Sequence, residues 1–278
     1  MTFDFTATGK VKITMEGYIG ELLKGCEDLK GTAPTPAKAE LFRVKPESSD
    51  PLIDNKQREK FHSITAQLLY LCKRVRPDVL TAVAFLTKRV TKPQQGDYDK
   101  LPRVIQYIPA TQDMGMVLEV RGTPTSTAYV DASYGVHPDM KSHTGCLVTL
   151  GAGSIYAKSG TQKLNTKSST EAELVGMSDS GDQIIWTRNF LSALSYNMPP
   201  ATIYQDNMSA IQLIKNGRSN SEKTTTDIKY FFLHDRILHG DICVKYMNTK
   251  DMIADVLTKP LQGEPSRVLR DKLLNWYV

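Results

Sequence analysis

The sequence predicts an α/β protein, with a mixed sheet flanked by helices that is preceded by a mostly helical segment. Two observations lead to this prediction. The C-terminal half opens with three short apolar strands and continues with strands that alternate with helices, an order typical of a mixed sheet. Residues 57–107 instead carry apolar side chains three and four positions apart, which is the helical period.

The composition is that of a globular protein with one or two domains. Of 278 residues, 40% are hydrophobic and 23% are charged, and the net charge is +5. No apolar run approaches the roughly 20 residues that span a bilayer. The first residues have neither the basic flank nor the apolar core of a signal peptide. We expect an intracellular protein, cytoplasmic or nuclear and not secreted, without a membrane partner.

The N-terminal half is expected to contain three segments. Residues 1–34 alternate apolar with polar side chains and then become helical, which predicts a hairpin and a short helix. Residues 35–56 form a linker that contains proline and lysine. Residues 57–122 form a helical segment, broken at Pro77, in which Pro102 is tolerable only in the first turn of a helix.

Residues 123–278 are expected to form the α/β domain. Its predicted strands are 126–131, 143–150 and 153–158, then 202–206 and the segment DICVKYM; its predicted helices include 169–194, 208–215 and one or two at the C-terminus. The four cysteines lack CxxC or Cys/His spacing, which indicates free thiols and no structural zinc.

Acidic residues stand at the ends of three of these elements. Asp131 and Asp206 each end an apolar strand, and Glu171 and Glu173 lie in the first turns of the long helix. Any one of them alone reads as a turn or cap residue. Carboxylates gathered at the carboxyl ends of neighbouring strands also make an oxygen-rich pocket that suits Mg²⁺ or Mn²⁺ better than zinc.

Six separated motifs allow a family comparison. YVDASY, VHPDMKSHTGCLVTLGAGSIYAKSG, SSTEAEL, YQDNMSAI, DIKYFF and ADVLTKPL stand in this order. Together they closely resemble the ribonuclease H domain of copia-type retrotransposon Pol polyproteins. FHSITAQLLYLCKRVRPDVLTAVAFLTKRVTKP resembles the connection segment of the same polyproteins, and residues 1–34 resemble the end of their reverse transcriptase. The resemblance implies a ribonuclease H-like sheet.

This resemblance also implies an activity and a cofactor. The family hydrolyses the RNA strand of RNA/DNA hybrids with two Mg²⁺ ions, for which Mn²⁺ can substitute. By motif match, Asp131 would bridge the two ions and Asp206 would hold the ion on the nucleophile side. Glu173 precedes a large apolar residue, as the family's glutamate does, whereas Ser168 and Glu171 fit a capping box. We therefore favour Glu173 as the ligand and keep Glu171 as the alternative.

A fourth metal-binding carboxylate is expected from the motif ADVLTKPL. Asp255 matches the family's acidic residue at the start of the final helix. Asp251 is the competing candidate, but an aspartate just before an apolar run is commonly a helix N-cap. We favour Asp255, which lies one helical turn further along.

Substrate-binding residues have weaker signals. Ser169, Thr170 and Asn207 match polar positions that contact the hybrid in the family, and Lys158, Lys163 and Lys167 are candidates for phosphate contacts. Basic residues also gather before the α/β domain, at Lys73, Arg74, Arg76, Lys88 and Arg89. These form either a solvated helix face or a phosphate-binding strip.

The sequence departs from the family in three ways. The paired-aspartate motif of the polymerase is absent, so we expect no DNA synthesis unless the rest of a reverse transcriptase acts as a partner. Thr224 and Thr225 stand where the family carries a basic residue and a histidine, and Pro102 and Pro109 would loosen the connection segment. The alternative function is therefore a decayed retroelement fragment that binds nucleic acid without catalysis.

Overall fold

The computed structural model describes residues 1–5, 7–29, 31–120, 122–216 and 225–277. The chain divides into two compact units. Unit 1 comprises Met1–Leu118 and Lys259–Val278, and unit 2 comprises Glu119–Thr258. The division into four segments expected from the sequence stays a prediction.

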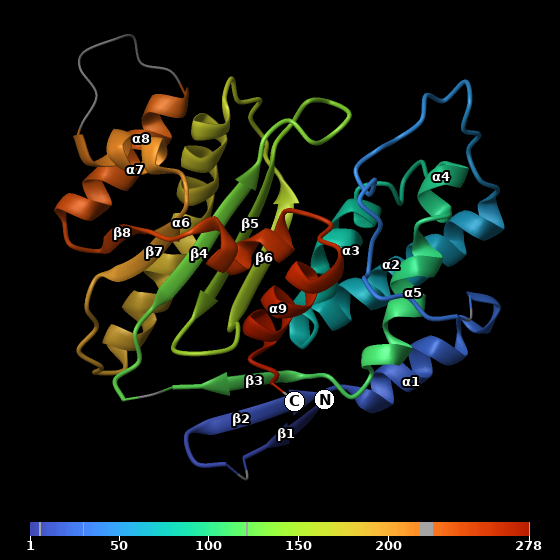
Figure 1. The fold of residues 1–278 in the computed structure, drawn as a ribbon, viewed down its shortest axis with the longest axis horizontal. Helices are drawn as coiled ribbons and strands as arrows, with labels where there is room; N and C mark the ends of the chain where they lie inside the picture. The colour runs from blue at the N-terminus through green and yellow to red at the C-terminus, as the bar shows by residue number, and fades with distance from the viewer. Residues whose placement is uncertain (6, 30, 121, 217–224, 278) are drawn as a thin grey trace. The chain divides into compact units, whose positions relative to one another are not determined.

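Unit 1 combines a small sheet with helices (Figure 1). The sheet has the order β1-β2-β3, and the predicted N-terminal hairpin is present as the antiparallel pair β1 and β2. Its elements are β1 (Thr2–Asp4), β2 (Lys10–Thr14), α1 (Glu16–Lys24), η1 (Glu27–Leu29), α2 (Asn55–Arg74), η2 (Pro77–Val79), α3 (Leu80–Thr87), α4 (Gln95–Tyr98), α5 (Leu101–Tyr107), η3 (Pro109–Thr111), β3 (Met116–Glu119) and α9 (Gly263–Leu274).

Three prolines set helix boundaries in unit 1. Pro77 begins the 3-10 turn between α2 and α3, as the sequence predicted. Pro102 lies in the first turn of α5 and Pro109 opens η3. Proline in a first turn removes no intrahelical hydrogen bond. Both prolines are therefore compatible with these helices, and a loosening of this segment stays a prediction.

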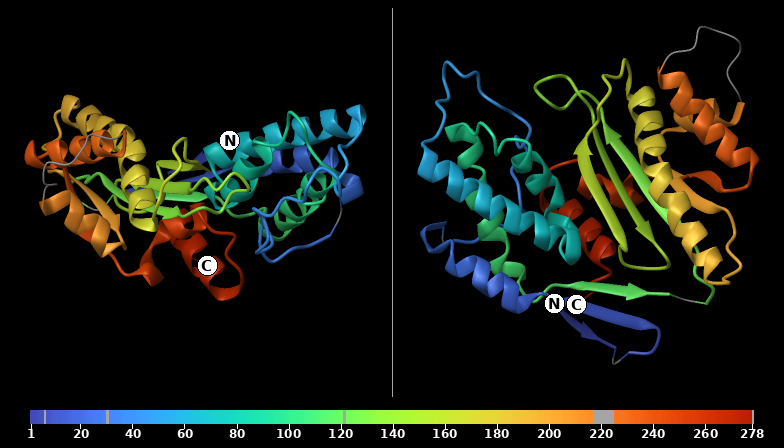
Figure 2. Two further views of the ribbon diagram at one scale, coloured as in Figure 1. Left: turned by 90° about the horizontal axis from the view of Figure 1, so that it is seen from above. Right: turned by 180° about the vertical axis from the view of Figure 1, so that it is seen from behind.

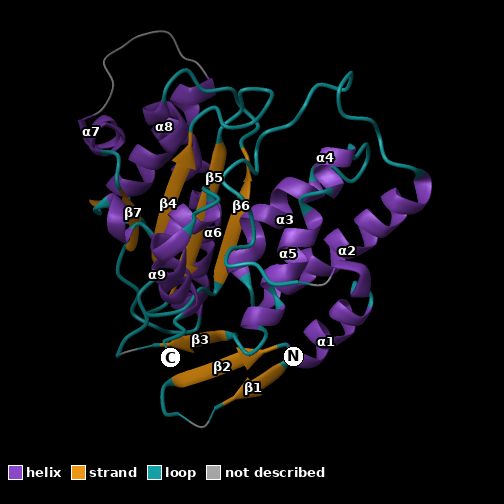
Figure 3. Cartoon of the chain, turned by 45° about the vertical axis from the view of Figure 1, so that its right-hand side comes forward, coloured by secondary structure: helices purple, strands orange, loops and turns teal. Residues whose placement is uncertain are grey.

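Unit 2 contains a five-stranded mixed sheet of order β6-β5-β4-β7-β8 (Figure 3). The strands are β4 (Thr127–Ser133), β5 (His143–Thr149), β6 (Tyr156–Thr161), β7 (Ala201–Gln205) and β8 (Ile242–Tyr246). The pairs β4/β5 and β5/β6 are antiparallel, whereas β4/β7 and β7/β8 are parallel. This order and these directions are those of the ribonuclease H-like fold, and the predicted fold class is confirmed.

Helices and 3-10 turns cover the sheet of unit 2. They are α6 (Ser169–Ala193), α7 (Met208–Asn216), α8 (Thr225–Leu238), η4 (Thr249–Asp251) and η5 (Ile253–Leu257). Figure 2 shows α6 lying along one face of the sheet. Thr144 and Gly145 are successive residues of β5, so they face opposite sides of the sheet. The Thr144 side chain lies against Gly176 of α6, whereas a Cβ at Gly145 would meet Leu257 and Thr258 at the end of η5. Therefore α6 and η5 pack on opposite faces.

The core of unit 2 lies between the sheet and its helices. It is built from buried apolar side chains of β4, β5, β7, β8, α6, α7 and α8, among them Val130, Cys146, Met177, Ile203 and Leu233. One predicted strand is displaced, because β6 begins at Tyr156 and not at residue 153. Ala152 forms a β-bridge with Glu119, so the connection between β5 and β6 is longer than a tight turn.

Candidate metal centre

The candidate site lies where two parallel strands separate. The ladder between β4 and β7 pairs Thr127–Tyr129 with Thr202–Tyr204 and goes no further. Asp131 stands two residues beyond its end on β4, and Asp206 directly follows β7. Strands that separate at their carboxyl ends leave room for a ligand, as is typical of α/β sheets.

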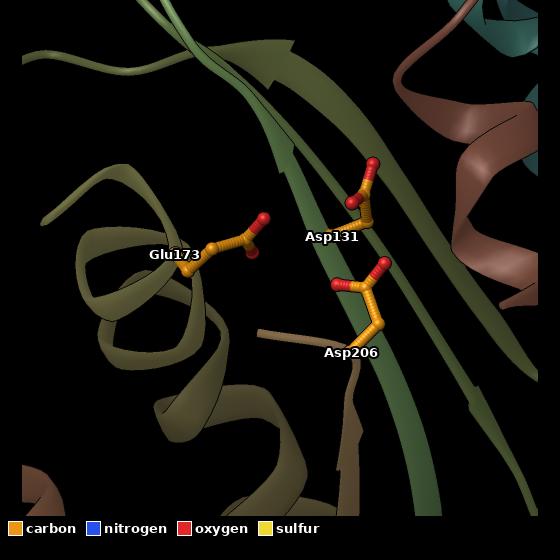
Figure 4. A group of neighbouring side chains, drawn as sticks. All are labelled: Asp131, Glu173 and Asp206. Atoms are coloured by element: carbon orange, nitrogen blue, oxygen red, sulfur yellow. The ribbon is translucent and has the colours of Figure 1, made fainter. Parts of the chain in front are cut away.

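Three carboxylates meet in this opening. Asp131, Glu173 and Asp206 each offer one oxygen, and these oxygens all lie within 4.8 Å of one another. Figure 4 shows Glu173 reaching from α6 toward the two aspartates. Asp131 and Glu173 are buried, and Asp206 is partly exposed, so the group has access to solvent on one side. In the described part of the chain this is the group of acidic residues that could hold a metal ion.

Burial and the neighbouring carboxylates disfavour the charged form of Glu173. The pKa of Glu173 is raised well above its ordinary value, first by burial and second by the negative charge of Asp131. Asp206 adds to the rise, while hydrogen bonds from Gln205 and from the backbone of Ala132 oppose it. Such a cluster of like charges is stabilised when a cation enters it.

The two glutamates at the start of α6 have different positions. Ser168 is the N-cap of α6 and accepts a hydrogen bond from the backbone N–H of Glu171. The carboxylate of Glu171 turns back and accepts from the backbone N–H of Lys167 at 2.6 Å. Glu171 thus serves the helix start, whereas Glu173, two residues on, belongs to the acidic group.

Each carboxylate of the group accepts a hydrogen bond from an uncharged side chain. Gln205 donates to Glu173 at 3.0 Å and Thr249 donates to Asp206 at 2.8 Å. The hydroxyl of Thr258 donates to Asp131. None of these three donors was predicted from the sequence. A polar glutamine at the end of the apolar run of β7 was the one signal that could have indicated Gln205.

Asp255 is not one of the three carboxylates whose oxygens lie within 4.8 Å of one another. It is buried on η5, a 3-10 turn separate from the final helix, so its predicted position at the start of that helix is wrong. Its backbone oxygen accepts a hydrogen bond from the backbone N–H of Thr258. The N-cap role considered for Asp251 is also wrong, because Asp251 is the last residue of η4 and the residue before η5 is Met252. A metal-binding role for Asp255 stays a prediction.

The predicted substrate-binding residues lie on β6 or just after it, at the start of α6, and shortly after β7. Ser169 and Lys163 are exposed, and Thr170 is partly buried. Lys158 donates to the backbone oxygen of Asp179 on α6 at 3.2 Å. Asn207 accepts from the backbone N–H of Ala210 and so caps α7. Their roles in substrate binding stay predictions.

The predicted basic strip of unit 1 is only partly exposed. Lys73, Arg74 and Lys88 are exposed. Arg76 is completely buried and ion-paired with Asp78 at 2.8 Å, so its predicted place in a solvent-facing strip is wrong. The ion pair makes this burial possible, because a buried guanidinium needs a buried counter-charge.

Arg89 is also engaged within unit 1. It is partly buried and donates to Asp97 at 2.8 Å and to Gln94 at 2.9 Å, at the start of α4. Three residues of the strip therefore keep the exposure that phosphate contact requires. Thr224, one of the two residues that depart from the family, lies outside the described residues, and Thr225 begins α8.

The four cysteines are free thiols, as expected. Among the described residues, no helix combines the length and apolar character that a bilayer span requires.

Comparisons with known proteins identify relatives of the chain, although no family model matches it. The retrovirus-related Pol polyprotein from transposon RE2 of Arabidopsis thaliana is 32% identical over 204 residues, or 73% of this chain. That from transposon TNT 1-94 of Nicotiana tabacum is 28% identical over 207 residues, or 74%. The truncated transposon Ty1-A Gag-Pol polyprotein of Saccharomyces cerevisiae is 28% identical over 233 residues, or 80%.

Solved structures with a similar fold include two enzymes of the RNase H1 type. LC11-RNase H1, isolated from compost, covers 49% of this chain with 93% of its own, at 12% identity and a TM-score of 0.37. RNase H1 from Halobacterium salinarum NRC-1 covers 48% with 93% of its own, at 12% identity and a TM-score of 0.34.

The sheet order and the acidic group define the class of unit 2, a ribonuclease H-like α/β protein with a candidate metal centre. The chain belongs to the family of retrovirus-related Pol polyproteins from copia-type transposons, which match 73% to 74% of its residues, and the resemblance expected from the motifs is confirmed. The chain spans only 14% to 19% of the length of these relatives and is consistent with their C-terminal reverse transcriptase and ribonuclease H region.

Proposed function

We propose that unit 2 is a divalent-metal-dependent endonuclease that hydrolyses the RNA strand of RNA/DNA hybrids. The observation that carries this proposal is the group of three carboxylates at the opening between β4 and β7. It stands in a chain whose relatives are transposon Pol polyproteins. Both the position in the sheet and the composition of the group support the same activity.

The donor set fits Mg²⁺, with Mn²⁺ as a substitute. Asp131, Glu173 and Asp206 offer only oxygen ligands, which hard divalent cations prefer. Bound there, Mg²⁺ would lower the pKa of a coordinated water and stabilise the negative charge that develops on the phosphate. Asp255 is proposed as a further carboxylate of the same site. Because the site is partly open at Asp206, a phosphodiester can approach from that side.

Residues of the chain would position the hybrid without reading its sequence. Proteins recognise such hybrids by backbone shape, phosphates and the 2′-hydroxyl. Ser169 and Thr170 at the start of α6, and Asn207 beside Asp206, carry groups that can donate to a sugar or phosphate. Lys158 on β6 and Lys163 just after this strand would contribute positive charge.

The context proposed for this activity is intracellular, either in a cytoplasmic retroelement particle or in the nucleus. Since the relatives are several times longer than this chain, the rest of a reverse transcriptase is a proposed partner. Without that partner, no DNA synthesis is expected.

The test is cleavage of an RNA/DNA hybrid in which either the RNA or the DNA strand is labelled. With Mg²⁺, the RNA strand alone should be cut, and EDTA, Asp131→Asn and Asp206→Asn should each reduce cutting to background. Asp139→Asn is a matched control, because Asp139 is an exposed aspartate of unit 2 outside the acidic group. That variant should cut at the wild-type rate.

Two results would contradict the proposal. Equal cutting by Asp131→Asn would place the activity elsewhere. Salt-sensitive binding of the hybrid without cutting would instead support a decayed fragment that only binds nucleic acid.

A further inference from the structure

One buried side chain touches all three segments that carry the acidic group. Gln205 is the last residue of β7 and has 0% of its surface exposed. It contacts the end of β4 through the backbone of Val130, α6 through Glu173, and the turn after β7 through Asp206 and Asn207. No apolar side chain could make these contacts at the same position.

Both halves of the Gln205 amide are fully used. Nε2 donates to the backbone oxygen of Val130 at 3.3 Å and to Oε2 of Glu173 at 3.0 Å. Oε1 accepts from the backbone N–H groups of Asp206 and Asn207, both at 2.8 Å. An amide has two N–H donors and two acceptor lone pairs, so its capacity is complete. These partners also determine the orientation of the amide, because the reversed amide would place its oxygen next to the Glu173 carboxylate.

The position of Gln205 explains how the opening keeps its shape. The ladder between β4 and β7 has Tyr129 and Tyr204 as its last pair. One residue beyond this pair, the Gln205 side chain of β7 donates to the backbone oxygen of Val130, the residue before Asp131. It thereby fixes the separation of the two strands at the point where their aspartates leave the sheet.

An uncharged donor suits a cation site better than a basic one. A lysine or arginine would orient the carboxylate but would also neutralise it and compete with the metal. A neutral amide holds one oxygen of Glu173 and leaves its charge available. Thr258, which is also completely buried, has the same relation to Asp131, and Thr249 has it to Asp206.

We propose that Gln205 is a positioning residue that holds Glu173 and the Asp206 turn in the geometry that binds the divalent cation. This role rests on the proposed function, because it assumes that the acidic group holds a metal. Partners that orient metal ligands in this way typically contribute 10- to 100-fold to metal affinity.

The experiment measures Mn²⁺ affinity of the full chain by electron paramagnetic resonance and calorimetry, without a nucleic acid. Gln205→Met is nearly isosteric and should weaken Mn²⁺ binding about 10- to 100-fold. Gln162→Met is the matched control. Gln162 is likewise a buried glutamine of unit 2, but its amide donates to Thr144 and to the backbone of Ala172 and touches none of the three carboxylates. It should lose stability while binding Mn²⁺ as the wild type does.

Thermal unfolding in EDTA checks that each variant is folded at the temperature of the binding measurement. If Gln205→Met does not fold, Gln205→Asn replaces it, since asparagine keeps the amide but is one methylene too short for all four contacts. Wild-type Mn²⁺ affinity in a folded Gln205 variant would overturn the positioning role. Equal Mn²⁺ binding by the wild type and Asp131→Asn would instead overturn the metal centre itself.

Discussion

Two buried carboxylates, Asp78 in unit 1 and Glu173 in unit 2, have opposite electrostatic surroundings. Asp78 in unit 1 pairs with Arg76, whose Nε and Nη2 donate to its two oxygens at 2.9 and 2.8 Å. Glu173 in unit 2 lies beside two other carboxylates and accepts its side-chain hydrogen bond from the neutral Gln205. Burial is similar, but the charge around each group is not.

The pKa values follow this difference. Burial disfavours the charged form of Asp78, yet the charge and hydrogen bonds of Arg76 and the hydroxyl of Tyr107 hold its pKa below the ordinary value. Burial also disfavours the charged form of Glu173, and there Asp131 adds to the effect, so its pKa is raised. The chain itself compensates the charge of Asp78. For Glu173 the compensation we propose comes from a bound cation.

The largest expected effect comes from removing the compensated charge. Asp78→Asn leaves the guanidinium of Arg76 buried without its counter-charge, and Arg76 is completely buried. Breaking one side of a buried ion pair typically costs about 3–5 kcal/mol. We expect a loss of that size in the free energy of unfolding, measured with urea. Hydrogen exchange should place the loss in unit 1.

A double variant tests whether the loss comes from the unpaired charge. Asp78→Asn combined with Arg76→Met removes both charges and should recover most of the stability, as replacing a whole buried ion pair often does. If the double variant is as unstable as Asp78→Asn, the hydrogen bonds of Arg76 to Thr111 matter more than its charge.

Acid should weaken the same network. The folded pKa of Asp78 is lowered, so its contribution is fully present above the unfolded pKa of about 3.9 and is lost as pH falls through the lower folded value. Between pH 5 and pH 2, the unfolding free energy of the wild type should therefore fall more steeply than that of the double variant. Parallel curves would mean that Asp78 does not titrate with folding.

The strands and helices could be predicted from the sequence because the spacing of apolar residues indicates which face of each element is buried. The strands before Asp131 and Asp206 and the long helix from Ser169 all occur close to their predicted bounds. The start of β6 was missed because the connection after β5 depends on a bridge between Ala152 and Glu119, which are distant in sequence. Pairing between remote residues leaves no local pattern.

Site residues could be predicted from the sequence only where the residue type itself indicates the chemistry. Carboxylates at element ends indicated Asp131, Glu173 and Asp206, which the fold brings together. Arg76 was misplaced because its sequence neighbours do not distinguish a buried arginine from an exposed one; Tyr107 and Thr111, which complete its site, lie some thirty residues away. Gln205 and Thr258 were missed because amides and hydroxyls have no characteristic pattern when they support a site.

The smallest expected effect has the opposite sign to that of Asp78→Asn. Glu173→Gln removes a charge that burial and Asp131 both disfavour, and it keeps an oxygen that can accept from Gln205. In EDTA at neutral pH, the variant should be more stable than the wild type, by on the order of 1 kcal/mol, as is common when a functional charge is removed. Urea unfolding measures the gain, and hydrogen exchange should place it in unit 2.

Magnesium should reverse this order. A cation that binds the folded wild type stabilises it by about 2.7 kcal/mol at a concentration 100 times its Kd, whereas the variant has lost one of three ligands and should gain little. Glu171→Gln is the matched control, because Glu171 accepts from the backbone of Lys167 and lies outside the acidic group. It should respond to Mg²⁺ as the wild type does. If Glu173→Gln instead destabilises the metal-free protein, then the chain already compensates this carboxylate, and the contrast with Asp78 does not hold.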